Sequence, residues 1–342
     1  MTTDYPESAA ARSAWIRSRR PPSLAGDPWR PQAWFREEER AASGELISVA
    51  TVLLTNRECP WHCLMCDLWR GMLRTRVPAG AIAAQLDFAL AQVGPARQLK
   101  LYNSGSFFDA GAIPPEEHDA LAERVRSFER VIVECHPALA GDSCLRFRDR
   151  LAKGPGEGRR GPELEVAMGL ETVHPVALER LNKRMTLDQF ARAAAFLARH
   201  GIAMRAFVLV QPPFVPPTEA VVWAARSVDF AFACGASVVS LIPTRPGNGA
   251  LDALQAQGVF APPALATLEA AAAYGVGLGR GRVFADLWDL ERFATCGACF
   301  PRRRERLQVL NTRQEIPPPV LCAECAGARE PGLVLASGQG LG

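Results

Sequence analysis

Three cysteines near the start of the chain lie at a spacing that suits a reactive metal centre. Cys59, Cys63 and Cys66 form the pattern C-x3-C-x2-C. Three thiolates leave one position of a four-coordinate metal open, which is typical of a reactive centre and not of a closed structural one. Ligation by cysteine alone favours an iron–sulfur cluster with one cysteine per iron, so that a fourth iron stays free for an exogenous ligand. The alternatives are zinc completed by His62, three unrelated thiols, and thiols buried on one helix face.

Four further cysteines form two C-x2-C pairs near the C-terminus. They are Cys296, Cys299, Cys322 and Cys325. Four thiolates close a tetrahedral site, the usual arrangement of structural zinc, although an auxiliary iron–sulfur cluster would use the same ligands. Between the pairs, the segment Pro301–Arg306 contains four arginines and could contact phosphate or form a solvated face. The other cysteines lack metal spacing and are expected to be inert buried thiols: Cys135, Cys144 and Cys234.

The segments between the two cysteine groups alternate between short apolar runs and helical patterns. Six runs rich in β-branched residues are predicted as strands: Leu46–Leu54, Gln98–Tyr102, Val131–Cys135, Leu164–Leu170, Ala203–Val210 and Ser237–Ile242. Helices are predicted between them, near 79–93, 115–128, 142–152, 175–200, 217–234 and 262–274. Near-continuous apolar strands suit a parallel sheet that is covered on both faces. Six strand–helix units therefore predict a parallel sheet or partial barrel, with the first cysteines at the edge where ligands bind.

Composition bounds the class of protein and its organisation. The chain has 342 residues, of which 48% are hydrophobic and 22% charged, which excludes a mostly disordered or fibrous protein. A net charge of +3 does not by itself indicate a nucleic-acid-binding protein. No membrane span or signal-peptide core is found, so a cytoplasmic protein is expected. The predicted division is an N-terminal extension over 1–45, a barrel over 46–275, a zinc-ribbon-like module over 276–328 and a disordered tail over 329–342.

The first cysteine motif and the later strand ends resemble the radical S-adenosylmethionine (AdoMet) superfamily over roughly residues 46–275. In that family three cysteines hold a 4Fe–4S cluster, and AdoMet chelates the open iron through its amino and carboxylate groups. The resemblance implies an α/β fold, a partial (β/α)6 TIM-type barrel, here followed by a small C-terminal metal-binding module with four cysteine ligands. It also implies two cofactors, the cluster and AdoMet, and an electron donor such as flavodoxin or ferredoxin.

The resemblance also marks candidate AdoMet-binding residues at the ends of three later strands. Ser104 and Gly105 occupy the place of the family's glycine-rich stretch, although the usual Gly-Gly-Glu is absent. Glu134 ends the third predicted strand, where a carboxylate is either a site residue or part of a buried ion pair. Glu171 lies in a G-x-E-[ST] segment at the end of the fourth, and Arg184 precedes the next helix and could pair with a carboxylate.

The strand-end motifs look most like the branch that holds the Elongator catalytic subunit and the archaeosine-forming tRNA enzyme. The resemblance therefore implies reductive cleavage of AdoMet and hydrogen abstraction from a tRNA or a modified nucleoside. A modifier of a peptide or small metabolite with an auxiliary iron–sulfur cluster is the competing enzyme hypothesis. A non-catalytic zinc-ribbon RNA-binding protein is a third hypothesis, against which the intact C-x3-C-x2-C motif argues.

Overall fold

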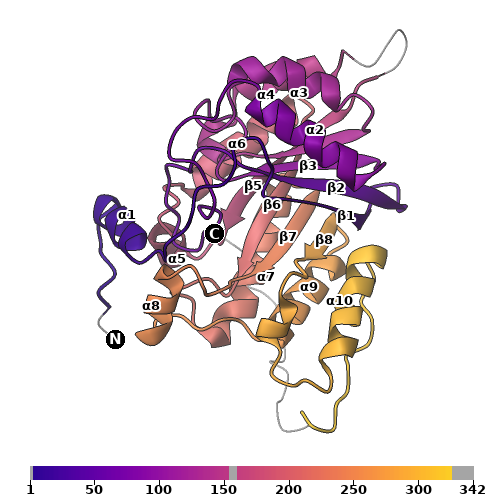
Figure 1. The fold of residues 1–342 in the computed structure, drawn as a ribbon. Helices are drawn as coiled ribbons and strands as arrows, with labels where there is room; N and C mark the ends of the chain where they lie inside the picture. Colours follow the sequence, from indigo (N-terminus) through magenta and orange to yellow (C-terminus); the bar gives the residue numbers. More distant parts are fainter. Residues whose placement is uncertain (1–2, 154–159, 326–342) are drawn as a thin grey trace.

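The computed structural model describes residues 3–153 and 160–325. The tail predicted as disordered, 329–342, lies outside these residues. The described part contains one eight-stranded sheet in the order β1-β2-β3-β4-β5-β6-β7-β8 (Figure 1). The strands are β1 Ala33–Arg40, β2 Leu46–Leu54, β3 Gln98–Asn103, β4 Arg130–Glu134, β5 Glu163–Glu171, β6 Ala203–Val210, β7 Val238–Pro243 and β8 Arg282–Ala285. Strands β2 to β8 are all parallel, and β1 runs antiparallel to β2.

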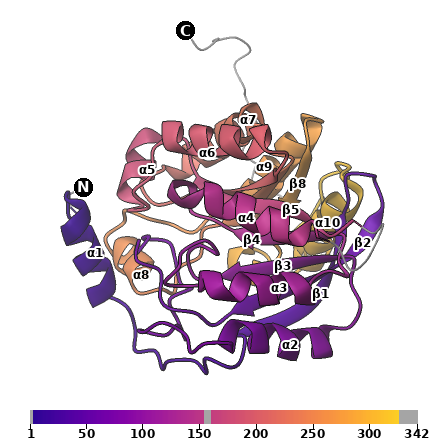
Figure 2. The ribbon, with the colours of Figure 1, turned by 90° about the horizontal axis from the view of Figure 1, so that it is seen from above.

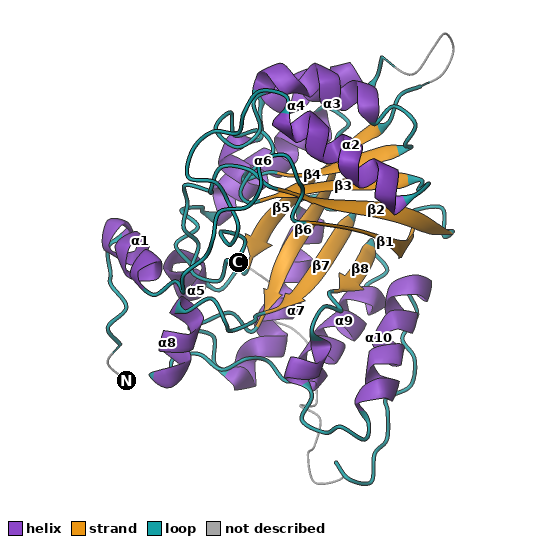
Figure 3. Cartoon of the chain, in the orientation of Figure 1, coloured by secondary structure: helices purple, strands orange, loops and turns teal. Residues whose placement is uncertain are grey.

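Helices connect the parallel strands and cover the outer face of the curved sheet (Figures 1 and 2). The connecting helices are α2 Ala81–Val93, α3 His118–Arg124, α4 Asp142–Leu151, α6 Leu187–Arg199, α7 Ala220–Ala233 and α9 Leu265–Gly277. Three further helices lie at the loop-rich side of the sheet (Figure 3): α1 Ala9–Ser18, α5 Pro175–Arg180 and α8 Ala250–Ala256. The last helix, α10 Phe300–Arg313, packs against α9, β8 and β1. Helices and strands share one hydrophobic core because their apolar faces are buried against each other.

Helix α6 illustrates how the sequence specifies one of these connections. The Thr186 hydroxyl accepts the Gln189 N–H over 3.2 Å, and Gln189 Oε1 accepts the Thr186 N–H over 2.9 Å. This capping box satisfies two amides that the first helical turn leaves free. Phe190 and Leu197 then bury one apolar face, and Gly201 follows the helix with a positive φ of 66°. The helix therefore begins at Leu187, directly after the Thr186 cap.

The predicted fold class is confirmed: the sheet is a partial α/β barrel, and four cysteines gather near the C-terminus. All six predicted strands are present, and the structure adds β1 and β8. Strand β1 is rich in charge and β8 has only four residues, so neither carries the apolar pattern of a buried strand. The predicted domain boundaries at residues 45 and 275 both fall between strands of this one sheet. The division into domains stays a prediction. Among the described residues, no helix has the length and apolarity needed to cross a membrane.

Strand β1 is held to other strands of the sheet by charged side chains that point into the interior of the barrel. The Glu39 carboxylate lies 2.7 Å from Lys100 Nζ on β3 and 2.6 Å from an Arg205 guanidinium nitrogen on β6. Arg205 also reaches Glu165 on β5 over 2.9 Å, and all four side chains are buried. Removing one member would leave the buried network with an unbalanced charge, which is destabilising. The charged side chains of β1 therefore join strands that are far apart in the sheet.

Candidate functional site

The first cysteine cluster lies in the irregular segment between β2 and α2. Its members are Cys59, Cys63 and Cys66. Because no helix covers this segment, the alternative of thiols on one helix face is wrong. The Leu64 N–H donates to the Leu181 carbonyl over 2.9 Å, and Asn248 Nδ2 donates to the Leu64 carbonyl over 2.8 Å. Leu64 is fully buried, so the loop is held at its centre by residues from two later loops.

The three thiols of this loop are half-buried, and they influence one another and a nearby cation. Burial raises the pKa of the Cys63 thiol to about 12, and the nearby Lys183 ammonium only partly opposes this rise. Burial also raises the pKa of Cys66, and the neighbouring thiols Cys63 and Cys59 add to it. Thiols in such surroundings stay protonated until a metal binds the thiolate and displaces the proton. The donor set is therefore suited to a metal group that supplies its own positive charge.

The two cysteine groups differ in how tightly their sulfur atoms are packed. The four C-terminal sulfur atoms all lie within 4.8 Å of one another, and the three of the first loop do not form such a group among the described residues. One cysteine per iron places the ligands around a polynuclear cluster, so wider spacing is expected there than around one ion. His62 points instead toward Glu58, with Nε2 3.6 Å from a carboxylate oxygen. These placements do not favour zinc completed by His62.

Gly105 leaves room beside the first cysteine. Its φ is +105°, and a Cβ atom built on it would lie 3.1 Å from Cys59 Sγ. The preceding residue is held by Asn56, which donates to the Ser104 carbonyl over 3.0 Å and accepts the Ser104 N–H over 3.1 Å. The Ser104 hydroxyl is buried without a partner among the described residues. An open backbone face next to a thiol, and an unsatisfied hydroxyl on the preceding residue, fit a bound cluster and its ligand. Asn56 carries no sequence signal that would have marked it.

Replacing Gly105 with alanine is expected to lower the iron content of anaerobically reconstituted protein by at least about half. The new Cβ would meet Cys59, and the positive φ disfavours any residue with a side chain by roughly 1 kcal/mol. Iron per chain, measured by a colorimetric assay, checks this result. Gly201→Ala is the matched control, because Gly201 also has a positive φ but its Cβ would meet no atom within 4 Å. Equal iron contents in the two variants would contradict the close approach at Cys59.

The end of β5 carries a buried ion pair that a glycine accommodates. Glu171 adopts a positive φ of 66° at a register shift in the sheet, and its carboxylate pairs with Lys183 Nζ. A Cβ atom on Gly169 would collide with both the carboxylate oxygen and the ammonium nitrogen. Burial tends to lower the pKa of Lys183, but the Glu171 carboxylate raises it, so the lysine stays charged. Because Gly169 has no side chain, the G-x-E sequence leaves room for the ion pair between Glu171 and Lys183.

Glu134 lies beside this ion pair without joining it. Its carboxylate accepts the Asn103 N–H over 3.2 Å, and none of the ion pairs found among the described residues includes it. Burial raises the pKa of Glu134 to about 8, while Lys183 lowers it and Glu171 raises it. The buried-ion-pair alternative for Glu134 is therefore not supported. The carboxyl group is available to a ligand that lies between the ends of β3 and β5.

Arg184 takes a different place from the one that its motif predicts. Its side chain is exposed and donates to the Ser13 hydroxyl of α1 over 2.8 Å, whereas the adjacent Lys183 is the residue paired with a carboxylate. The expected pairing of Arg184 is thus corrected to Lys183. Asn182 also contacts Ser13, over 3.1 Å, and donates to the His62 carbonyl over 3.1 Å. This segment therefore links α1 to the cysteine loop, and an AdoMet contact by Arg184 stays a prediction.

An aromatic pair, Trp61 of the cysteine loop and His136, connects this loop to the segment that follows β4. The rings of Trp61 and His136 are stacked with centroids 4.2 Å apart and an interplanar angle of 12°. His136 Nδ1 accepts the Ala138 N–H over 3.2 Å, so Nε2 carries the proton and donates to the Lys183 carbonyl over 3.0 Å. Burial and Lys183 lower the pKa of His136 to about 4, which keeps the ring neutral. His136 thus fixes Trp61 and the Lys183 backbone relative to β4.

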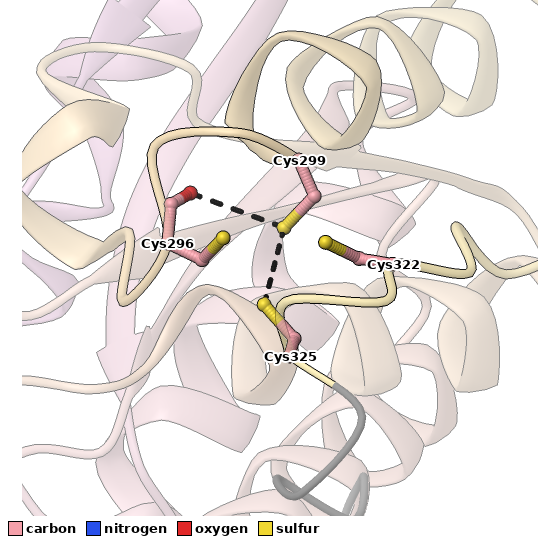
Figure 4. Close-up of side chains that lie close together, drawn as sticks. All are labelled: Cys296, Cys299, Cys322 and Cys325. Atoms are coloured by element: carbon pink, nitrogen blue, oxygen red, sulfur yellow. Dashed lines mark hydrogen bonds between the residues drawn. The ribbon is translucent and has the colours of Figure 1, made fainter.

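The second cysteine group brackets helix α10 (Figure 4). Cys296 and Cys299 precede the helix, and Cys322 and Cys325 follow it. The Sγ atoms of Cys299 and Cys325 are 3.6 Å apart. Four thiolates at about 2.3 Å from one tetrahedral zinc ion stand about 3.8 Å from each other. The spacing therefore fits a single tetrahedral ion.

The arginine-rich segment Pro301–Arg306 forms the first turns of α10 and is only partly exposed. Arg303 Nε donates to the buried Glu269 of α9 over 3.0 Å, and Arg306 Nη1 lies 3.4 Å from the same carboxylate. Arg302 donates to the Leu321 carbonyl over 3.0 Å, beside the second cysteine pair. Two of the four arginines therefore attach the helix to the barrel and do not present a free phosphate-binding face.

Known proteins that resemble this chain in sequence include two archaeosine synthase subunits. No family model matches the chain. The chain is 26% identical over 232 residues to the archaeosine synthase subunit beta of Methanosarcina acetivorans, covering 65% of each protein. It is 26% identical over 174 residues to the archaeosine synthase subunit beta of Thermococcus kodakarensis, covering 48% of this chain and 51% of that protein. The chain thus spans just under two thirds of the first relative and about half of the second.

Solved structures give more distant similarities. Methylornithine synthase (PylB) aligns with a TM-score of 0.49 and 11% identity, covering 69% of this chain and 64% of that one. The archaeal Elp3 of Methanocaldococcus infernus aligns with a TM-score of 0.43 and 12% identity, covering 60% and 50%. The names of the two sequence relatives confirm the predicted resemblance of this chain to archaeosine-forming enzymes.

Proposed function

We propose that this protein is a radical AdoMet enzyme whose cluster is held by Cys59, Cys63 and Cys66. The observation that carries the proposal is the close approach of Gly105 to Cys59, at the carboxyl edge of a parallel barrel. A 4Fe–4S cluster with AdoMet at this site would supply a 5′-deoxyadenosyl radical that abstracts hydrogen from the substrate. An external one-electron donor, such as a flavodoxin or ferredoxin, would complete the system.

The residues around the cysteines have distinct proposed roles in holding AdoMet. Glu171, oriented by Lys183, supplies a fixed carboxylate, and Glu134 supplies a second carboxyl group. The Ser104 hydroxyl and the backbone at Gly105 supply polar groups next to Cys59. Trp61, stacked on His136, shields one side of the loop from water. These groups orient the bound cofactor and exclude solvent, which is the main work left to the protein in cofactor-dependent catalysis.

We propose zinc as the occupant of the C-terminal cysteine group. Sulfur atoms that all lie within 4.8 Å of one another support one ion in preference to an auxiliary iron–sulfur cluster, in which different irons separate the ligands. The site would then stabilise the connection of α10 to the segment that follows it. A structural zinc site leaves the first cysteine group as the reactive one.

We propose a tRNA, or a modified nucleoside within it, as the substrate. The name of the sequence relatives, archaeosine synthase subunit beta, supports this choice over a peptide or a small metabolite. The test is anaerobic incubation of reconstituted protein with dithionite and AdoMet, with and without bulk tRNA. The expected result is 5′-deoxyadenosine whose yield rises with tRNA. No 5′-deoxyadenosine under either condition would contradict the enzyme proposal. A yield that responds to peptides and not to tRNA would contradict only the substrate class.

A further inference from the structure

The two edges of the sheet, β1 and β8, approach each other and leave an aromatic pair between them. Arg282 on β8 donates to the Arg40 carbonyl on β1 over 2.9 Å. Toward the other end of β1, the Phe35 ring lies 5.2 Å from that of Trp288, three residues beyond the end of β8. Because β8 is parallel to β2, its carboxyl end lies at the edge that carries the cysteine loop. The aromatic pair therefore borders the mouth of the barrel.

Phe35 belongs to the face of β1 that is turned into the barrel. Alternate residues of a strand share one face, and Glu37 and Glu39 both reach the interior Lys100 over 2.7 Å. Phe35 shares their face, whereas Trp34 points to the opposite side and packs against Phe88 of α2 at 5.0 Å. Because Phe35 faces the interior of the barrel, its contact partner Trp288 lies at the wall of the barrel mouth.

Trp288 is exposed although its turn is firmly held. Its side chain is 53% exposed. The Trp288 N–H donates to Asp286 Oδ1 over 3.0 Å, and Arg245 bridges the turn by contacting Asp286 at 2.8 Å and the Trp288 carbonyl at 2.5 Å. The Trp288 backbone is fixed and one face of its indole ring is open. A ligand that stacks on the ring therefore does not have to order this turn when it binds.

The surroundings of the indole decide which kind of group it suits. Asp289 and Arg292, on the same turn, are both more than half exposed, and the Arg245 guanidinium holds the Trp288 backbone. A hydrophobic helix or peptide would have to desolvate these charges. A nucleobase stacks on an aromatic face while its polar edges stay in water, so it can bind the indole without displacing the water around these charges.

We propose that Trp288, supported by Phe35, is a stacking platform for one unpaired nucleobase of an RNA substrate at the barrel mouth. This inference rests on the tRNA substrate proposed above and assigns the surface that receives it. The bound base would hold the RNA beside the opening of the barrel. The adjacent nucleotide of the RNA would then face the barrel interior. The platform is a binding surface, so it is expected to act on RNA affinity and not on cofactor binding.

The experiment measures RNA binding by the full-length reconstituted protein, with fluorescently labelled tRNA transcript and a labelled short single-stranded RNA as probes. Trp288→Ala is expected to weaken binding of both by at least about fivefold, because base–aromatic stacking is worth roughly 1–3 kcal/mol per base. Trp288→Phe keeps a ring and should lose less. Trp34→Ala is the matched control, since Trp34 is also exposed but packs on the outer face of β1. Its affinity should equal that of the wild type.

Three outcomes separate this inference from the proposed function. Wild-type protein that binds tRNA with an affinity unchanged in Trp288→Ala would overturn the platform and leave the tRNA proposal standing. Equal losses in Trp288→Ala and Trp34→Ala would also overturn it, because the effect would then be a general one. Wild-type protein that binds neither probe would overturn the tRNA proposal and the platform together. Iron content and thermal midpoint, measured on the same samples, should stay at wild-type values.

Discussion

Replacing Lys183 with methionine is expected to lower the free energy of unfolding by about 3–5 kcal/mol, because the buried Glu171 carboxylate would lose its cation. Methionine has a similar length and fills the same space, so the loss measures charge and not a cavity. The variant is also expected to bind AdoMet at least about tenfold more weakly, since Glu171 would no longer be held in one orientation. Urea unfolding and equilibrium binding of AdoMet to the reconstituted protein check the two effects.

Arg184→Met is the matched control for this substitution. Arg184 is the next residue in the chain, but its side chain is exposed and its contact is with the Ser13 hydroxyl. The expected loss is about 1 kcal/mol or less, as for surface substitutions that remove one hydrogen bond. The double substitution Lys183→Met with Glu171→Gln should recover part of the stability, because no unpaired charge remains. Equal losses in the two single variants would contradict the assignment of Lys183 as the buried partner.

Cysteine substitutions are expected to remove the two metal groups independently. Wild-type protein reconstituted with iron and zinc should hold about four irons and about one zinc. Cys63→Ala should lose nearly all of the iron and all 5′-deoxyadenosine formation while it keeps the zinc. Cys299→Ala should lose the zinc and keep the iron, because its sulfur belongs to the separate group beside α10. Metal analysis by mass spectrometry and the AdoMet cleavage assay give the readouts.

The result in Cys299→Ala also decides the identity of the second metal. A wild-type protein with about eight irons and no zinc, reduced to about four irons in this variant, would show an auxiliary cluster and refute the zinc proposal. Cys234→Ala is the control, because Cys234 is a half-buried thiol at the end of α7, outside both groups. It should keep both metals.

The strands illustrate what could be predicted before the structure. The runs of β2 and β6 are mostly apolar, as expected of strands covered on both faces, and their bounds follow from that pattern. Strand β1 could not be recognised in the same way. Its partners for Glu37 and Glu39 are Lys100 and Arg205, which come from distant strands, so its charges are satisfied only after the barrel has formed.

The sequence by itself determined the two cysteine groups, the parallel barrel and the place of Gly105, because ligand spacing, apolar runs and backbone freedom are local properties. Only the tertiary structure decided which cation meets Glu171. Lys183 and Arg184 are adjacent in the chain, and the positive φ values of Asn182 and Arg184 turn one side chain inward and the other toward α1. Contacts such as Trp61 on His136 and Trp288 on Phe35 join residues that are distant in sequence, and no local pattern specifies them.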